Sequence, residues 1–285
     1  MTQAAAEEDL GTPAQNRWIY YLALTRPLNL GIILFSFLLA YHITGGVDSL
    51  LEILLILEYL LLAAAGYTAN DIHDRDADAI NRPGRPLCRG LDVKKAFSFF
   101  LYLSAAAFLL NFVFPVWLFF FNLFVALLLL LYSFQRKKGL FLGNISVALA
   151  TASPFGAVML LKGMSPALGV PLLFSFFIIW MREITKDLDD REGDKKAGRL
   201  TLPLLAGQAG AHGTLWVLTF IFAGFTMWGS IIARYPVRYG VSIQGIVNLC
   251  NALSLYFVMR ENYKAAETVY KVAILIGMGG LWLSV

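Results

Sequence analysis

Long apolar runs, separated by short polar segments, occupy most of this chain. Runs long enough to span a hydrocarbon core, which takes about 20 helical residues, fall at 27–46, 50–71, 95–113, 115–135, 140–161, 167–187, 212–233, 239–259 and 265–284. The runs are least separated between 95 and 135, and Gly and Pro interrupt the pattern between 197 and 215. The pattern predicts an all-α polytopic membrane bundle of about nine transmembrane helices.

Composition supports this interpretation. Apolar residues make up 58% of the 285 positions and charged residues only 15%, and the mean hydropathy is +0.66. These values lie far outside the range of soluble domains. We therefore treat residues 1–285 as a single integral-membrane domain. The polar N-terminus is not a cleavable signal peptide, and the two cysteines are too few for a disulfide framework.

Lys and Arg are distributed very unevenly between the predicted loops. They concentrate before the first span and after the second, fourth, sixth and eighth, whereas the other side keeps only Lys162, Arg234 and Arg238. Positive charge accumulates on the cytoplasmic side of membrane proteins. We therefore expect a protein of the cell membrane whose N-terminus lies on the cytoplasmic side. The net charge of +4 follows from this bias and does not indicate a nucleic-acid partner. Nothing in the sequence indicates an obligate protein partner.

Two acidic motifs stand in the same register at the ends of the second and sixth spans. Each reads D-x-x-D-x-x-x-D, and the six positions are Asp71, Asp74, Asp78, Asp187, Asp190 and Asp194. Positions i, i+3 and i+7 share one face of an α-helix, so each motif is expected to present a stripe of carboxylates. Magnesium prefers oxygen ligands and bridges carboxylates to phosphate oxygens. Ionisable groups at membrane depth are costly and usually functional.

The matched motifs also suggest an internal repeat. They are four spans apart, and an even number of crossings preserves direction, so the repeat would be parallel. Its two four-helix units would cover about 15–135 and 140–260. Both motifs would then open into one shared cytoplasmic mouth.

Basic and amide side chains lie close to the aspartates in the chain. The segment 81–90, NRPGRPLCRG, contains glycines and prolines that forbid a continuous helix, so its arginines can fold over an anionic group. Positive-inside bias alone also explains a basic loop here, and a salt-bridge lattice with Glu183 is a competing explanation around the second motif. The candidates for anion or substrate binding are Arg26, Arg82, Arg85, Arg89, Tyr132, Ser133, Arg136, Lys137, Lys138, Asn144, Arg182 and Lys186.

Together these features indicate a substrate with a diphosphate head and a long apolar tail. Magnesium and basic side chains would neutralise the charge that grows on a departing pyrophosphate, and aromatic faces would shelter the allylic cation that results. A transporter of divalent cations or phosphorylated lipids is a different possibility. Transporters place their ionisable residues near the bilayer midplane, whereas the carboxylates here crowd one membrane face.

The motifs resemble those of a known family. NDIHDRDADAINRPGRPL at 70–87 and KDLDDREGD at 186–194 closely resemble the two signatures of the UbiA superfamily of intramembrane prenyltransferases, and TRPLN at 25–29, YS at 132–133 and LGN at 142–144 are also similar to it. The resemblance implies a helical bundle around a central cavity that opens sideways to lipid. It also implies two Mg²⁺ ions, bound by the six aspartates and Asn70.

The same resemblance implies roles for further residues. The aspartates and Lys186 would form the catalytic set. Arg136 stands where many members carry an apolar residue, which leaves either Arg136 or Lys137 as the phosphate ligand. Contacts with the diphosphate or the substrate are expected from Arg26, Asn29, Asn70, Arg82, Arg85, Tyr132, Ser133, Lys137, Asn144 and Arg182.

Within the superfamily, the run at 182–203 looks most like the archaeal digeranylgeranylglyceryl phosphate synthase branch. That likeness implies transfer of a geranylgeranyl group from its diphosphate to the hydroxyl of geranylgeranylglyceryl phosphate, in ether-lipid synthesis. An aromatic acceptor, as in quinone biosynthesis, is the alternative, because aromatic prenyltransferases share much of the second motif. The sequence does not fix the prenyl chain length.

Overall fold

The computed structural model describes residues 17–135, 142–232 and 234–285. Every regular element within these ranges is helical. The helices are α1 (Arg17–Thr25), α2 (Pro27–Ile43), α3 (Leu50–Asn81), α4 (Val93–Asn111), α5 (Val116–Gln135), α6 (Leu142–Lys162), α7 (Pro166–Asp189), α8 (Arg191–Lys196), α9 (Leu202–Leu205), α10 (Gly207–Ile232), α11 (Val237–Tyr239), the π-helix η2 (Gly240–Val247), α12 (Asn248–Met259) and α13 (Tyr263–Trp282).

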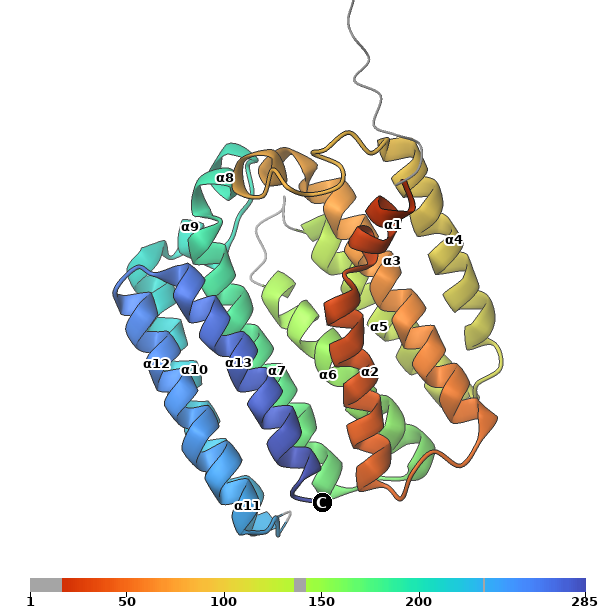
Figure 1. The fold of residues 1–285 in the computed structure, drawn as a ribbon, viewed down its shortest axis with the longest axis vertical. Coiled ribbons are helices and arrows are strands. Elements are labelled where there is room, and N and C mark those ends of the chain that lie inside the picture. Colours follow the sequence, from red (N-terminus) through yellow and green to blue (C-terminus); the bar gives the residue numbers. More distant parts are fainter. Residues whose placement is uncertain (1–16, 136–141, 233) are drawn as a thin grey trace, which may run out of the picture.

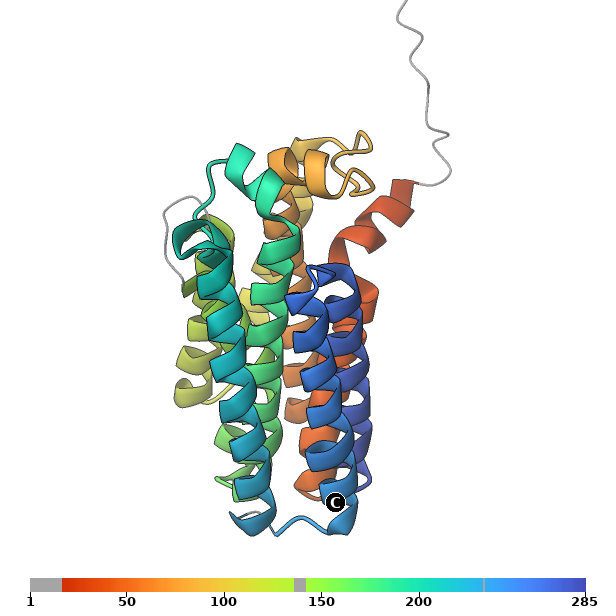
Figure 2. The same ribbon diagram turned by 90° about the vertical axis from the view of Figure 1, so that its left-hand side faces the viewer.

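The long helices lie side by side in one bundle (Figures 1 and 2). Helix α3 packs against α4 and α5, α6 packs against α5 and α7, and α7 packs against α10 and α13. Large side chains such as Phe155, Phe174 and Phe222 fill the centre and are fully buried, while many other apolar side chains point outward. An apolar exterior is what a hydrocarbon solvent requires.

Each of the nine predicted apolar segments coincides with a helix or a helix group. By length and composition, six described helices are able to cross a membrane, or seven if α1 and α2 form one bent span. The apolar part of α5, Val116–Tyr132, is shorter. The all-helical membrane fold is therefore confirmed, and the exact count of nine crossings is not.

The break between α1 and α2 follows from Pro27. A residue that precedes proline is disfavoured in the right-handed helical region, and Arg26 adopts a left-handed backbone with φ of 51°. The two helices meet at a bend of 46°. Strained backbone of this kind is typical of functional positions, and it places the Arg26 side chain against α3.

Helix α3 is the longest element, with 32 residues. It starts with an N-cap at Ser49, whose hydroxyl accepts from the backbone N–H of Glu52. The helix continues beyond the apolar run to Asn81, so the whole first motif is helical, as the register predicts. The segment 82–92 that follows is not helical, which agrees with its prolines and glycines.

The second motif is not one continuous helix, contrary to the expectation. Helix α7 ends at Asp189, Asp190 lies in the break with φ of −84° and ψ of 2°, and α8 begins at Arg191. Asp187 and Asp194 therefore lie on different helices. Helix α8 packs against α3, at the end of the bundle that also carries α1 (Figure 1).

Candidate active site

The first motif forms a buried carboxylate face near the end of α3. Asp71, Asp74 and Asp78 are all buried, although they follow the most apolar stretch of α3. Asn70 shares this face and donates from Nδ2 to Asp74 at 2.9 Å. The helical register thus places one amide and three carboxyl groups in the same direction.

The second motif is equally buried but is held by three different elements. Asp187 is on α7, Asp190 is in the break, and Asp194 is on α8. The break turns α8 toward the end of α3, where Asn81 donates from Nδ2 to the backbone carbonyl of Asp190 at 3.0 Å. An added Cβ at Gly193 would collide with the Asn81 side chain, so a larger residue here would force that side chain or α8 to shift.

One arginine joins the two motifs. The Arg199 guanidinium donates to Asp194 at 2.9 Å and to Asp74 through its other amine. Arg82, just after α3, pairs with Asp190 at 2.9 Å. Burial alone would lower the pKa of Arg82, but Asp190 and other nearby carboxylates raise it above its usual value. The Arg199 contacts therefore bring a carboxylate of each acidic motif to one guanidinium group.

Two further arginines meet on Asp71. Arg26 donates to it from the α1–α2 break, and Arg85 donates to it from the loop after α3 at 3.1 Å. Burial and the neighbouring Arg26 lower the pKa of Arg85. The Arg26 guanidinium also lies 5.0 Å from the ring centroid of Tyr67. This arrangement gathers cations at a single carboxylate, which suits an anionic ligand.

The third side of the site comes from α5, α6 and α7. Asn144 donates to Asp187 at 2.8 Å. Glu183, one turn before Asp187, accepts from the Tyr132 hydroxyl at 3.3 Å and from Lys186 Nζ at 3.1 Å. Lys186 Nζ is also 3.4 Å from the Tyr132 hydroxyl. The salt-bridge network predicted around Glu183 is therefore present, and it lies beside Asp187.

Arg182 extends this lattice to α13. Its Nη1 lies 3.4 Å from Glu183, and its Nη2 lies 2.9 Å from Glu267, which Lys271 also contacts at 3.0 Å. The Nε atom of Arg182 is buried without a hydrogen-bond partner. Arg182 thus holds two acidic residues on neighbouring helices and keeps one donor unused.

The carboxylates of Asp71, Asp74, Asp190 and Asp194 are bound to arginine in this structure. Over the described ranges, no group of three or more His, Cys, Asp or Glu side chains is arranged as a ready metal site. The donor set nevertheless fits magnesium, because all six acids and Asn70 offer oxygen. Asn70 Oδ1 is buried without a partner, and no hydrogen bond or ion pair of the described residues reaches the Asp78 carboxylate.

Most predicted site residues are brought together, but some are not. Arg89 is exposed on the loop surface. Arg136, Lys137 and Lys138 lie outside the described residues, as does the side chain of Ser133. Four residues at the site were not predicted to belong to it: Asn81, Arg199, Tyr67 and, except as a salt-bridge partner, Glu183.

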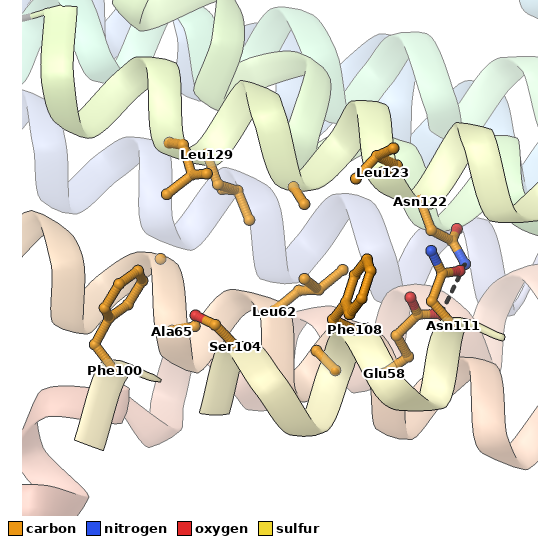
Figure 3. Close-up of a pocket in the computed structure, with 14 residues that line it drawn as sticks. Glu58, Leu62, Ala65, Phe100, Ser104, Phe108, Asn111, Asn122, Leu123 and Leu129 are labelled. Carbon is orange, nitrogen blue, oxygen red and sulfur yellow. Dashed lines mark hydrogen bonds between the residues drawn. The ribbon is translucent and has the colours of Figure 1, made fainter. Parts of the chain in front are cut away.

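A cavity of about 230 Å³ lies elsewhere, between α3, α4 and α5 (Figure 3). Its walls are apolar, with Phe100, Leu62 and Phe108 among them, and its polar end is formed by Glu58, Asn111 and Asn122. Asn122 donates to Glu58 at 2.7 Å and to Asn111 at 3.2 Å. None of the six aspartates lines this cavity, so it is separate from the site described above.

The geometry agrees with a comparison against protein families. The model of the UbiA prenyltransferase family matches residues 29–276, a range that contains both acidic motifs. The chain belongs to the UbiA prenyltransferase family. This family member is a prenyltransferase and an integral membrane protein.

Curated relatives of this UbiA member are archaeal synthases. The digeranylgeranylglyceryl phosphate synthase of Thermococcus gammatolerans is 33% identical over 266 residues, which cover 90% of this chain and 92% of that protein. The synthase of the same name from Methanococcoides burtonii is 34% identical over 283 residues, with coverage of 90% and 96%.

Solved structures share the UbiA fold. An apo UbiA homologue from Aeropyrum pernix has a TM-score of 0.74 at 17% identity and covers 90% of this chain and 98% of that one. A structure from work on digeranylgeranylglyceryl phosphate synthase in membranes has a TM-score of 0.71 at 24% identity, with coverage of 94% and 98%. A homologue from Archaeoglobus fulgidus bound to GPP and Mg²⁺ has a TM-score of 0.64 at 21% identity, with coverage of 92% and 99%.

Proposed function

We propose that this protein transfers a geranylgeranyl group from its diphosphate to geranylgeranylglyceryl phosphate, in a magnesium-dependent reaction of archaeal ether-lipid synthesis. The observation that carries this proposal is the convergence of two buried acidic motifs on one shared arginine, Arg199. The names of the relatives support the acceptor, and the Archaeoglobus fulgidus homologue, bound to GPP and Mg²⁺, supports the donor and the metal.

The residues that would hold magnesium are the six aspartates and Asn70. Bound there, magnesium would neutralise the charge that grows on the diphosphate as its bond to the prenyl carbon breaks. We propose two ions, because the acids form two groups of three. The carboxylates would exchange their arginine partners for the metal and the diphosphate together, so no buried charge is left uncompensated.

The basic residues would bind the diphosphate directly. Guanidinium groups match phosphate oxygens with paired donors, and Arg26 and Arg85 already lie together on Asp71. Arg26 also has a buried Nε without a partner, which supplies a donor for a phosphate oxygen. Lys186 lies one residue from Asp187, so it would reach the same group from α7.

We further propose the membrane orientation that the charge distribution predicts. The N-terminus and the site would face the cytoplasm, and each of the nine helical segments would cross the membrane. Helix α8 of the second motif lies at one end of the bundle, and α11, which contains Arg238, lies at the other end (Figure 1), which supports this orientation. The parallel repeat remains a prediction.

The test is a transfer assay with the purified full chain. Labelled geranylgeranyl diphosphate and magnesium are incubated with geranylgeranylglyceryl phosphate, 4-hydroxybenzoate or a naphthoate acceptor. We expect an ether product only with the first acceptor, and we expect EDTA to stop the reaction and magnesium to restore it. A prenylated aromatic ring would replace our proposal with the quinone-pathway alternative, and metal-independent transfer would contradict the magnesium site.

A further inference from the structure

The acceptor hydroxyl must lose its proton during ether formation. As the C–O bond to the diphosphate breaks, its electron pair leaves with pyrophosphate, and a lone pair of the acceptor oxygen forms the new C–O bond. The O–H electron pair then returns to the oxygen, and the proton passes to another group. This requirement rests on the proposed function, since a ring-carbon acceptor would lose a different proton.

We propose that Glu183 receives this proton through the hydroxyl of Tyr132. In this relay the acceptor O–H donates to the Tyr132 oxygen while the Tyr132 proton moves to Glu183. Glu183 becomes a neutral carboxylic acid and later returns its proton to water. The step is balanced without any further reagent.

Glu183 is the buried acid at this end of the bundle to which the proposed magnesium sites assign no role. The six motif aspartates are assigned to the metal, and the other acids near them, such as Asp76, Glu192 and Glu267, are exposed or half-buried. Among the described residues, Glu183 is the buried acid beside the aspartates that belongs to neither motif. It lies one helical turn from Asp187, on the membrane side of it.

The contacts of Glu183 provide the path for the proton. Its Oε2 already accepts from the Tyr132 hydroxyl at 3.3 Å, so the last transfer of the relay occurs along an existing hydrogen bond. Tyr132 is itself buried, on α5, and its hydroxyl is 3.4 Å from Lys186 Nζ. A lysine that binds the diphosphate would therefore place the reacting carbon close to the Tyr132 hydroxyl.

The ion pairs around Glu183 do not disqualify it as a proton acceptor. Arg182 and Lys186 pair with Glu183 and hold its carboxylate beside the Tyr132 hydroxyl. An alkyl oxygen that has just bonded to a cationic carbon is a very strong acid, so an ion-paired carboxylate suffices to take its proton. Arg182 is in turn held by Glu267 on α13, and this contact keeps the carboxylate in place before substrate binds.

The experiment separates proton transfer from substrate binding. Glu183→Gln keeps the size of the side chain and its hydrogen bonds to Tyr132 and Lys186, but it cannot take up the proton. We expect single-turnover transfer to geranylgeranylglyceryl phosphate to fall about 100-fold or more, the usual contribution of a general base. Affinity for a non-hydrolysable thio analogue of the prenyl diphosphate should change less than about threefold, because the phosphate ligands are intact.

Two companion variants sharpen the test. Glu183→Asp retains a carboxylate and should recover part of the lost rate, whereas Tyr132→Phe removes the relay and should lower the rate without reducing affinity for the analogue. If Glu183→Gln transfers at the wild-type rate, pyrophosphate itself takes the proton and our inference is wrong. If rate and affinity fall together, Glu183 only positions Lys186 for the diphosphate, which also overturns it. Failure of the proposed function can be told apart from failure of this relay, because the wild-type protein would then form no ether at all.

Discussion

Asp74 and Asp194 bind the same guanidinium group, that of Arg199, although they belong to different acidic motifs. All three side chains are buried. Removing one partner of a buried ion pair leaves an uncompensated charge and costs about 3–5 kcal/mol. Arg199 therefore holds the two halves of the site together.

Replacing Arg199 by Ala should destabilise the metal-free protein strongly. We expect its free energy of unfolding in EDTA to fall by about 3 kcal/mol, and magnesium with a diphosphate should restore much of the loss because these ligands neutralise the same carboxylates. Thermal unfolding in detergent measures both effects. Arg75→Ala is the matched control, since Arg75 is half exposed and pairs only with the exposed Asp76. Equal stability of the two variants would contradict the role of Arg199.

Replacing Asp74 or Asp190 by Asn should stop turnover without unfolding the chain. The change preserves size and hydrogen bonding but removes a charged ligand, so we expect the transfer rate to fall by about 100-fold or more. The rate is measured with labelled geranylgeranyl diphosphate, and the melting temperature confirms folding. Asp76→Asn on the same helix is the control, because Asp76 is exposed and outside the register. Near-normal rates in both motif variants would refute the site.

Replacing Gly193 by Ala should push α8 away from α3. A new Cβ there collides with the Asn81 side chain, so we expect the transfer rate to fall about tenfold or more as Asp194 and Arg199 lose their contact with Asp74. Adding Asn81→Ala to the same chain should recover part of the rate, which a double-mutant cycle measures. Gly213→Ala in α10 meets no atom within 4 Å and should be silent. A Gly193 variant with full activity would show that the close packing is dispensable.

Replacing Lys162 by Met should affect stability and leave chemistry unchanged. Lys162 binds Asp48 at 2.7 Å, buried Glu52 at 3.0 Å and the Gly46 carbonyl at 3.0 Å, at the end of the bundle opposite the aspartates. Loss of this donor leaves Glu52 poorly satisfied, so we expect a cost of about 2 kcal/mol in the free energy of unfolding. The transfer rate at saturating substrate should not change. Arg238→Ala, an exposed residue at the same end, should alter neither quantity.

The apolar pattern and the acidic register predicted much of this molecule. Within the described residues, a helix or helix group lies over each expected apolar segment, and the motif spacing identified the aspartates that converge. The break at Asp190 was not predictable, because neither proline nor glycine stands at that position, and the end of α7 is set by the packing of α8 on α3. Arg199 lay within the family-like run at 182–203, but its contact with Asp74 joins elements far apart in the chain, and helical periodicity carries no information on such pairs.

The arginines on the aspartates have a consequence for how this protein is made. A nascent chain that buries acidic groups needs counter-ions from the moment it folds, and for Asp71, Asp74, Asp190 and Asp194 this chain supplies arginines itself. The chain would therefore be able to fold in the bilayer before a metal binds, and the magnesium that we propose would enter later together with the prenyl diphosphate. Enzyme abundance would then be independent of magnesium supply, while catalysis would still require it.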